Sequence, residues 1–212
     1  MIAWHYIIAS IHSHRLLSMK RVILFVALCL LWSCATAADP IKVRFETNVG
    51  TFVVALYPDK APKTVDNFMK YVQGGFYDGT IIHRVVRGFV IQGGGYTPDG
   101  TPKETLPPIP NESHNGLSNL RGTIAMARTQ DPNSATSQFY INTADNTRLD
   151  YQNGKPGYTV FGKVIEGMDV IDKIEQSPVA PDPNLGPHRP LEDIIIIRAR
   201  RVLTPLNTWL NQ

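Results

Sequence analysis

The sequence predicts an all-β-dominated fold: a closed eight-stranded antiparallel β-barrel capped by two α-helices. Two observations lead to this prediction. Short segments in which apolar and polar residues alternate recur along the chain, mostly beside a segment with which they can pair. Only two segments, near residues 61–73 and 166–175, have apolar residues at helical spacing. Closure into a barrel follows because it removes the exposed strand edges that so many short strands would otherwise leave.

The first two strands are expected at residues 41–47 and 51–57, with a turn at residues 48–50. Alternation places five apolar side chains on their inward faces: Val43, Phe45, Phe52, Val54 and Leu56. A helix is then expected to begin near Pro62, because proline suits a first helical turn, and to end at Gly74. Its apolar residues Val65, Phe68, Met69 and Val72 share one face.

Two unusual segments follow, at residues 82–94 and at residues 121–129 running on to 134–142. Both alternate like strands, with Gly88 as a bend in the first. However, they carry large polar groups and small residues where an ordinary core strand would carry aliphatic ones. These segments are therefore the candidates for a functional site.

The remaining elements are less distinctive. Five prolines rule out a central strand within residues 97–119, so a long surface loop is expected there, of a length that is often functional. A strand is expected at residues 158–164. Met168, Ile171 and Ile174 should point inward from the helix at residues 166–175. The last strand should cover residues 191–202, where four consecutive isoleucines, 194–197, predict burial on both faces or closure of a barrel.

Residues 1–38 have the pattern of an N-terminal extension and a cleavable signal peptide. Lys20 and Arg21 precede an apolar run at residues 22–32, and small residues at positions 35–38 follow. The apolar run is short for a membrane span. We expect translation to start at Met19, cleavage to follow Ala37 or Ala38, and a single domain to occupy residues 39–212.

Removal of this segment changes the charge of the protein. Residues 1–38 hold three basic residues and no acidic ones, so 18 of the 21 basic residues remain against 18 acidic ones. A neutral domain gives no reason to expect a nucleic-acid or anionic-membrane partner.

Both cysteines also fall in this segment, so residues 39–212 contain no disulfide. An alternative stays open for Cys34: residues 31–34 loosely resemble a bacterial lipoprotein processing site, which would anchor the product by lipid. Trp32 fits that pattern poorly. We favour the periplasm as the location, ahead of secretion or lipid anchoring.

Other kinds of active site are disfavoured. There is no Gly-x-Ser-x-Gly motif, and the histidines of residues 39–212, which are His83, His114 and His188, lack metal-ligand spacing. Residues 93–95 are three glycines, but Pro98 stands where a dinucleotide-binding loop needs its third glycine. No metal or other cofactor is expected.

Taken together, residues 82–94 (IHRVVRGFVIQGG), 121–129 (RGTIAMART) and 134–142 (SATSQFYIN) resemble the active-site strands of cyclophilin-type peptidyl-prolyl cis–trans isomerases, in particular the bacterial exported, periplasmic type. The resemblance extends from about residue 41 to 202 and implies the barrel with a helix at each end. It also implies rotation about the peptide bond that precedes proline, in exported unfolded or folding polypeptides.

The resemblance assigns roles to individual residues. Arg84 and Gln92 are the expected catalytic residues, since a fixed guanidinium can donate a hydrogen bond to the prolyl nitrogen of a twisted amide. The expected substrate-binding residues are Phe89, Val90, Met126, Ala127, Arg128, Gln138, Tyr140, Leu149 and Tyr158. For Phe89 and Met126 plain core packing is the alternative, for Gln138 a buried structural amide, and for His83 a structural role is as plausible as a catalytic one.

Three positions depart from the animal pattern of the family. Arg148 stands where that pattern has tryptophan, Tyr158 where it has histidine, and Tyr140 where it has phenylalanine. Because the tryptophan is the family's contact for cyclosporin, we expect weak inhibition by that drug. The competing function is a chaperone that binds proline-containing peptides with little turnover. We expect a monomer whose partners are proline-containing polypeptides.

Overall fold

The computed structural model describes residues 40–203. The predicted signal peptide, the proposed start at Met19 and Cys34 all lie outside the described residues. Eight strands form one antiparallel sheet in the order β10-β1-β2-β7-β5-β6-β4-β3. These strands are β1 (Ile41–Thr47), β2 (Thr51–Leu56), β3 (Ile82–Val86), β4 (Val90–Gly93), β5 (Thr123–Met126), β6 (Phe139–Asn142), β7 (Val160–Glu166) and β10 (Ile196–Val202).

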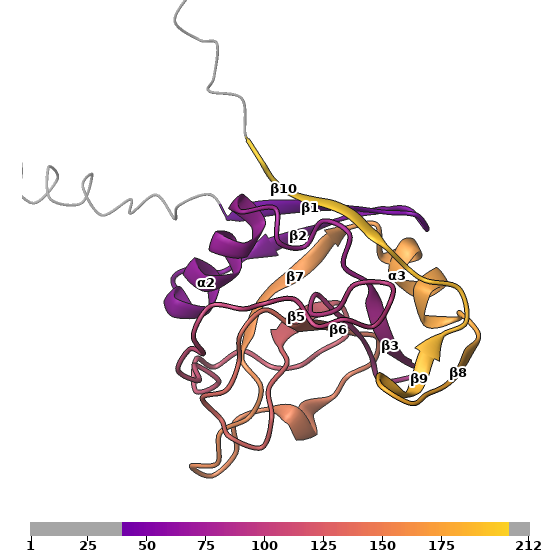
Figure 1. The fold of residues 1–212 in the computed structure, drawn as a ribbon. Helices are drawn as coiled ribbons and strands as arrows, with labels where there is room; N and C mark the ends of the chain where they lie inside the picture. Colours follow the sequence, from indigo (N-terminus) through magenta and orange to yellow (C-terminus); the bar gives the residue numbers. More distant parts are fainter. Residues whose placement is uncertain (1–39, 204–212) are drawn as a thin grey trace, which may run out of the picture. The chain divides into compact units, whose positions relative to one another are not determined.

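The sheet curls until its two outer strands meet (Figure 1). Ile81, just before β3, forms a bridge with Ile195, just before β10. The amide of Ile82 donates to the carbonyl of Ile194 (2.9 Å), and the amide of Ile196 donates to that of Thr80 (2.8 Å). The predicted eight-stranded antiparallel fold with two helices is therefore confirmed, and a short bridge joins the outer strands.

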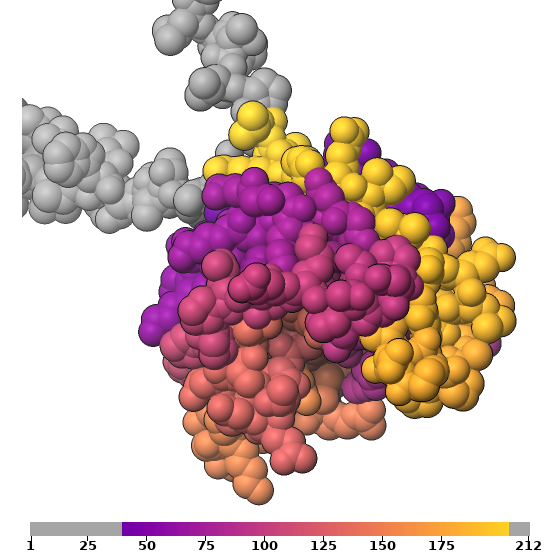
Figure 2. All heavy atoms as spheres, in the orientation of Figure 1, coloured from indigo at the N-terminus to yellow at the C-terminus, as the bar shows by residue number. Residues whose placement is uncertain are grey.

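Two α-helices accompany the sheet, α2 (Pro62–Gln73) and α3 (Met168–Glu175), to the left and right of it in Figure 1. Each has one apolar face, as its sequence predicts. Large aromatic side chains fill the space that the curled sheet encloses: Phe45, Phe52, Phe68, Tyr77, Phe139 and Phe161. Figure 2 shows the yellow C-terminal segments against the purple N-terminal ones, in agreement with the pairing of β10 and β1.

The structure corrects two expectations near the C-terminus. Of the two interpretations of residues 194–197, burial on both faces is wrong, because Ile194 and Ile196 are buried while Ile197 is 54% exposed. The bridge from Ile195 to Ile81 favours the other interpretation, closure of the barrel. Within β10 only Ile196 and Ala199 are buried, because one face of the strand lies over the core and a register shift opposite Thr47 interrupts its alternation. The sequence also gave no indication of the hairpin formed by β8 (Val179–Asp182) and β9 (Gly186–Pro190), whose prolines argue against strands.

The described residues contain no helix that is both long enough and apolar enough to cross a membrane. Within the same residues there is no group of three or more His, Cys, Asp or Glu side chains that could hold a metal ion.

Candidate functional site

The outward face of the sheet carries one row of paired residues across five strands. Arg84 on β3 pairs with Gln92 on β4, and Gln92 pairs with Tyr140 on β6. Tyr140 pairs in turn with Ala125 on β5, and Ala125 with Val160 on β7. Directly paired residues lie on the same face of a sheet, so this register brings the predicted catalytic pair beside an aromatic ring.

Residues that alternate with this row point into the core, and Met126 is one of them. Met126 is 2% exposed and packs in the main aromatic core, and Ile124, two residues earlier, packs in the same core. Ala125, between them, packs instead with Val90, Tyr140 and Val160 beneath the outward face. The expectation that Met126 lines the pocket was therefore wrong, because a strand sends successive side chains to opposite faces.

A tight turn between β3 and β4 fixes the position of Phe89. The segment predicted as one bent strand is a hairpin, closed by the amide of Phe89 donating to the carbonyl of Val86 (3.0 Å). Gly88 has a φ of 68°, a conformation that glycine adopts without steric cost. The carbonyl of Phe89 accepts from the amide of Thr143 (3.0 Å) and from Nδ2 of Asn146 (2.9 Å). The ring is thus presented from an anchored backbone.

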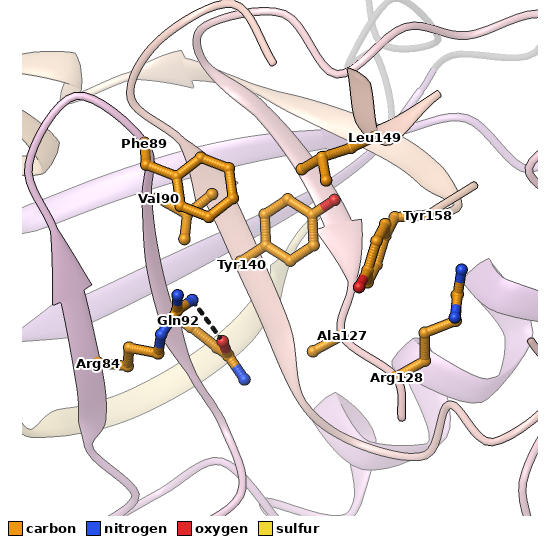
Figure 3. Close-up of a pocket in the computed structure, with 9 residues that line it drawn as sticks. All are labelled: Arg84, Phe89, Val90, Gln92, Ala127, Arg128, Tyr140, Leu149 and Tyr158. Atoms are coloured by element: carbon orange, nitrogen blue, oxygen red, sulfur yellow. Dashed lines mark hydrogen bonds between the residues drawn. The ribbon is translucent and has the colours of Figure 1, made fainter. Parts of the chain in front are cut away.

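The outward face is hollowed into a pocket of about 160 Å³ (Figure 3). This volume is below the roughly 300–1,000 Å³ of sites for drug-sized ligands, and suits a single small side chain or ring. The pocket gathers all the predicted site residues except Met126 and Gln138. Its lining consists of Arg84, Phe89, Val90, Gln92, Ala127, Arg128, Tyr140, Leu149 and Tyr158.

A chain of polar side chains forms one side of the site. Nη1 of Arg84 donates to Oε1 of Gln92 (3.2 Å), and Nε2 of Gln92 donates to Oε1 of Gln138 (3.0 Å). Gln138 thus supports Gln92 from behind, and Gly95 makes room for it, since a Cβ at that position would lie 2.6 Å from Cγ of Gln138. These bonds orient the Gln92 amide and one edge of the Arg84 guanidinium.

Arg84 is half-buried but keeps its charge. Burial lowers the pKa of its guanidinium, yet the ordinary value is so high that arginine stays protonated in proteins. No ion pair within residues 40–203 joins Arg84 to a carboxylate. Its positive charge is therefore available to a bound molecule.

The opposite wall is built from two tyrosines and an arginine. The rings of Tyr140 and Tyr158 meet edge to face, with centroids 5.8 Å apart. The guanidinium carbon of Arg128 lies 4.4 Å from the centre of the Tyr158 ring. Carbonyls hold this guanidinium in place: Nε donates to Gly157 (3.2 Å), Nη2 to Pro156 (3.0 Å) and Nη1 to Thr129 (2.8 Å).

Below the pocket lies a buried amide that our sequence analysis missed. Oδ1 of Asn119 accepts from the Tyr140 hydroxyl (2.7 Å), and its Nδ2 donates to Oδ1 of Asp150 (2.8 Å). Asp150 follows Leu149 directly, and the amide of Tyr158 donates to the Leu149 carbonyl (2.8 Å). Asn119 therefore connects Tyr140 to Asp150, and through the backbone beside Asp150 to Tyr158. It ends the long loop at residues 97–119, just before the segment 121–129 but outside the residues that carry the resemblance, so only its contacts reveal this role.

His83 faces away from the site. Its ring packs against Tyr96, with centroids 4.8 Å apart, and is almost completely buried. Burial, with a smaller contribution from the charge of Arg84, lowers the pKa of His83 from 6.5 to about 4. This favours the structural interpretation of His83.

We predict that His83 makes the protein acid-sensitive. Because its folded-state pKa lies below the unfolded value, the unfolded chain takes up a proton first as the pH falls. The neutral, buried His83 contributes its full share to the free energy of unfolding above pH 6.5. This share falls as the pH drops below 6.5, and the loss reaches about 3 kcal/mol at pH 4. Urea unfolding at several pH values should show this loss, and the His83→Gln variant should lack that part of it. An equal pH dependence in both proteins would contradict the prediction.

Comparison with known proteins identifies a family. Residues 42–201 match the family described as "Cyclophilin type peptidyl-prolyl cis-trans isomerase/CLD". Peptidyl-prolyl cis-trans isomerase A of Dickeya dadantii (strain 3937) is 50% identical over 166 residues, which cover 77% of this chain and 86% of that protein. Peptidyl-prolyl cis-trans isomerase B of Escherichia coli (strain K12) is 50% identical over 159 residues, covering 73% of this chain and 95% of that protein.

A solved structure agrees with both relatives. The crystal structure of a Cryptosporidium parvum cyclophilin type peptidyl-prolyl cis-trans isomerase, determined in the presence of the dipeptide Ala-Pro, superposes with a TM-score of 0.66 at 31% identity. The match covers 77% of this chain and 99% of that one.

Proposed function

The chain belongs to the cyclophilin-type peptidyl-prolyl cis–trans isomerases, and on that basis we propose that its isomerase activity resides in the pocket between Arg84 and Tyr158. The observation that carries this proposal is the row in which Arg84, Gln92 and Tyr140 stand side by side on an outward face. The roles below are derived from that geometry.

The reaction needs a polarised amide and a place for the proline ring. The barrier to rotation is about 18–20 kcal/mol because the C–N bond is partly double. When the bond twists, the prolyl nitrogen regains a lone pair that can accept a hydrogen bond. The Arg84 guanidinium, which is oriented by Gln92 and has no carboxylate partner among the described residues 40–203, donates to that lone pair. This hydrogen bond forms only in the transition state, so it lowers the barrier without tightening substrate binding.

The apolar part of the pocket receives the proline ring. Phe89, Val90 and Leu149 supply apolar surface, and Tyr140 and Tyr158 close the far side. Gln92 binds the substrate backbone beside the rotating carbonyl, with its amide held by Gln138. No nucleophile or metal takes part in this scheme, because no covalent bond is broken.

The family resemblance implies that backbone groups of Ala127 and Arg128 pair with an extended substrate, but only one of the two amides is available for this. The amide of Ala127 donates to the carbonyl of Gln138 (3.0 Å), so it is not available to a substrate. The amide of Arg128 has no acceptor within residues 40–203. We therefore assign pairing with an extended peptide to the Arg128 backbone, and apolar contact to the Ala127 side chain.

NMR exchange spectroscopy of a short X-Pro peptide with the purified protein tests the proposal. Without the protein, the cis and trans resonances of the peptide should show no exchange within the mixing time, because uncatalysed isomerisation takes on the order of tens of seconds or longer. When the protein is added, exchange between the two resonances should become visible. A Phe89→Ala variant should lose most of this effect. Peptide binding without faster exchange would instead favour the chaperone that binds proline-containing peptides with little turnover.

We further propose that the protein acts on exported polypeptides in the periplasm. The support is the pattern of residues 20–38, in which two basic residues precede an apolar run and small residues follow it. Expression from Met19 in a Gram-negative host, followed by fractionation and mass analysis, tests this proposal. A periplasmic product beginning at Ala38 or Asp39 would support it, whereas a cytoplasmic product of full length would contradict it, and a lipid-modified Cys34 would select the anchored alternative.

Three earlier expectations stay predictions. We expect a monomer, to be checked by light scattering, and no nucleic-acid or membrane partner. We also expect weak inhibition by cyclosporin, because the exposed Arg148 takes the place of the tryptophan on which that drug relies.

A further inference from the structure

Three guanidinium groups surround the proposed proline pocket, and each lies against an aromatic ring. The guanidinium carbon of Arg148 is 4.8 Å from the centre of the Phe89 ring, and that of Arg84 is 5.8 Å from the same ring. Arg128 lies 4.4 Å from the Tyr158 ring. Figure 3 shows Arg84 and Arg128 at opposite ends of the pocket with the aromatic rings between them. Contact with a ring holds a cation in position without neutralising it.

None of these three arginines forms an ion pair within residues 40–203. The arginines that do are Arg121, Arg189, Arg198 and Arg200, each with an aspartate or glutamate. Residues 39–212 carry equal numbers of acidic and basic residues, so carboxylates are not scarce. Arg44, Arg87 and Arg201 also lack an ion pair within residues 40–203, so the pocket is distinguished by having three such guanidinium groups close together around it.

The carboxylates nearest to the pocket in the chain are already engaged. Asp150, which follows Leu149, accepts hydrogen bonds from the Ser118 hydroxyl and from the backbone and side chain of Asn119. Asp145, three residues before Arg148, accepts from the amide of Arg121 (2.8 Å), and Asp131, three residues after Arg128, accepts from the amide of Asn133 (2.9 Å). In the part of the chain that the structure describes, none of these carboxylates forms an ion pair with the three guanidinium groups.

The free hydrogen-bonding capacity is concentrated on Arg148. Backbone carbonyls take up most of the donors of Arg128, and one edge of Arg84 is bound to Gln92. Arg148 is exposed and donates no hydrogen bond to any residue in the 40–203 range. It sits on the short helix η1 (Thr147–Leu149), next to the pocket residue Leu149. A guanidinium placed in this way can bind a carboxylate through two parallel hydrogen bonds.

We propose that this isomerase prefers peptides with an aspartate or glutamate immediately before or after the proline, and that Arg148 determines this specificity. The inference rests on the proposed function of the pocket. A carboxylate beside the proline comes within reach of Arg148 or Arg128, whereas a lysine at the same place is repelled by all three guanidinium groups. Since these charges are partly in water, the preference is moderate and depends on salt.

The test compares peptides that differ only in charge. Glu, Gln or Lys is placed before the proline in one series and after it in a second, and kcat/KM is measured by NMR exchange. In at least one series we expect the Glu peptide to exceed the Gln peptide about three-fold and the Lys peptide about ten-fold at low ionic strength. Both ratios should approach one at about 0.5 M salt, where the Debye length is only a few ångströms. Ratios within error of one at low salt in both series would overturn the inference.

Variants separate Arg148 from general charge effects. The Arg148→Glu variant should reverse the order of the Glu and Lys peptides. The matched control Arg44→Glu, an exposed arginine on β1 outside the pocket, should leave the order unchanged. If Arg148→Glu does not fold, the Arg148→Gln variant should lower the Glu:Lys ratio toward one, and an unchanged ratio would contradict the role of Arg148. Turnover of the Gln peptides without charge discrimination would refute this inference alone, whereas no turnover of any peptide would refute the proposed function.

Discussion

Replacing Arg84 with alanine is expected to lower kcat/KM for X-Pro isomerisation by about 10²–10³-fold, the usual loss when one preorganised donor to a transition state is removed. The loss should fall on kcat, with KM changed little, because the hydrogen bond to the prolyl nitrogen exists only while the amide is twisted. The polar chain from Arg84 through Gln92 to Gln138 gives the guanidinium its fixed direction. NMR exchange rates measured over a range of peptide concentrations provide both parameters.

Two further variants sharpen the Arg84 prediction. Arg84→Lys keeps the charge but not the planar group, so it should recover only part of the activity if the direction of the hydrogen bond matters. Arg44→Ala, on the exposed face of β1, should retain full activity. A rise in KM at constant kcat in Arg84→Ala would show that Arg84 only binds the substrate, and would transfer the catalytic role elsewhere in the pocket.

The site residues that could be predicted from the sequence lie on β-strands, in which successive side chains point to opposite faces of the sheet. Arg84 and Gln92 were assigned from the motif around them, and the antiparallel register of β3 and β4 does place them side by side. The same alternation contradicts the assignment of Met126, whose neighbours Ala125 and Ala127 are the residues on the pocket side. Here a resemblance to a family was followed where the local geometry of the strand was the better guide.

The part that could not be predicted depends on contacts between distant segments. Asn119 joins Tyr140 and Asp150, which lie 21 and 31 residues further along the chain. An asparagine in a loop that also contains Asn111 and Asn115 looks like an ordinary loop residue, and no pattern in the sequence gives its partners. The β8–β9 hairpin was missed because its prolines argue against a strand. Proline is tolerated in these two strands because they pair only with each other.

Glu112, like Asn119, is a residue of the long loop whose contacts the sequence did not predict. Its carboxylate lies at the start of α2. The residue before this helix, Ala61, provides no side-chain cap. The carboxylate of Glu112 takes over that function from the distant loop: it accepts from the amides of Lys63 (3.1 Å) and Thr64 (2.9 Å) and from the Thr64 hydroxyl (2.7 Å). A negative charge at a helix N-terminus also interacts favourably with the helix dipole. One buried side chain thus joins the long loop to α2.

We therefore expect Glu112→Ala to lower the free energy of unfolding by about 3–5 kcal/mol, since it removes charge-assisted hydrogen bonds and leaves buried donors without an acceptor. Glu112→Gln keeps one acceptor oxygen and should lose about half as much. Glu104→Ala, at an exposed position of the same loop, should stay within about 0.5 kcal/mol of the parent. Urea unfolding measures all three, and the slope with denaturant should stay constant if only native-state stability changes. If Glu112→Ala unfolds at the same urea concentration as Glu104→Ala, the loop and α2 are held together by apolar packing, and the carboxylate merely occupies a site that water could fill equally well.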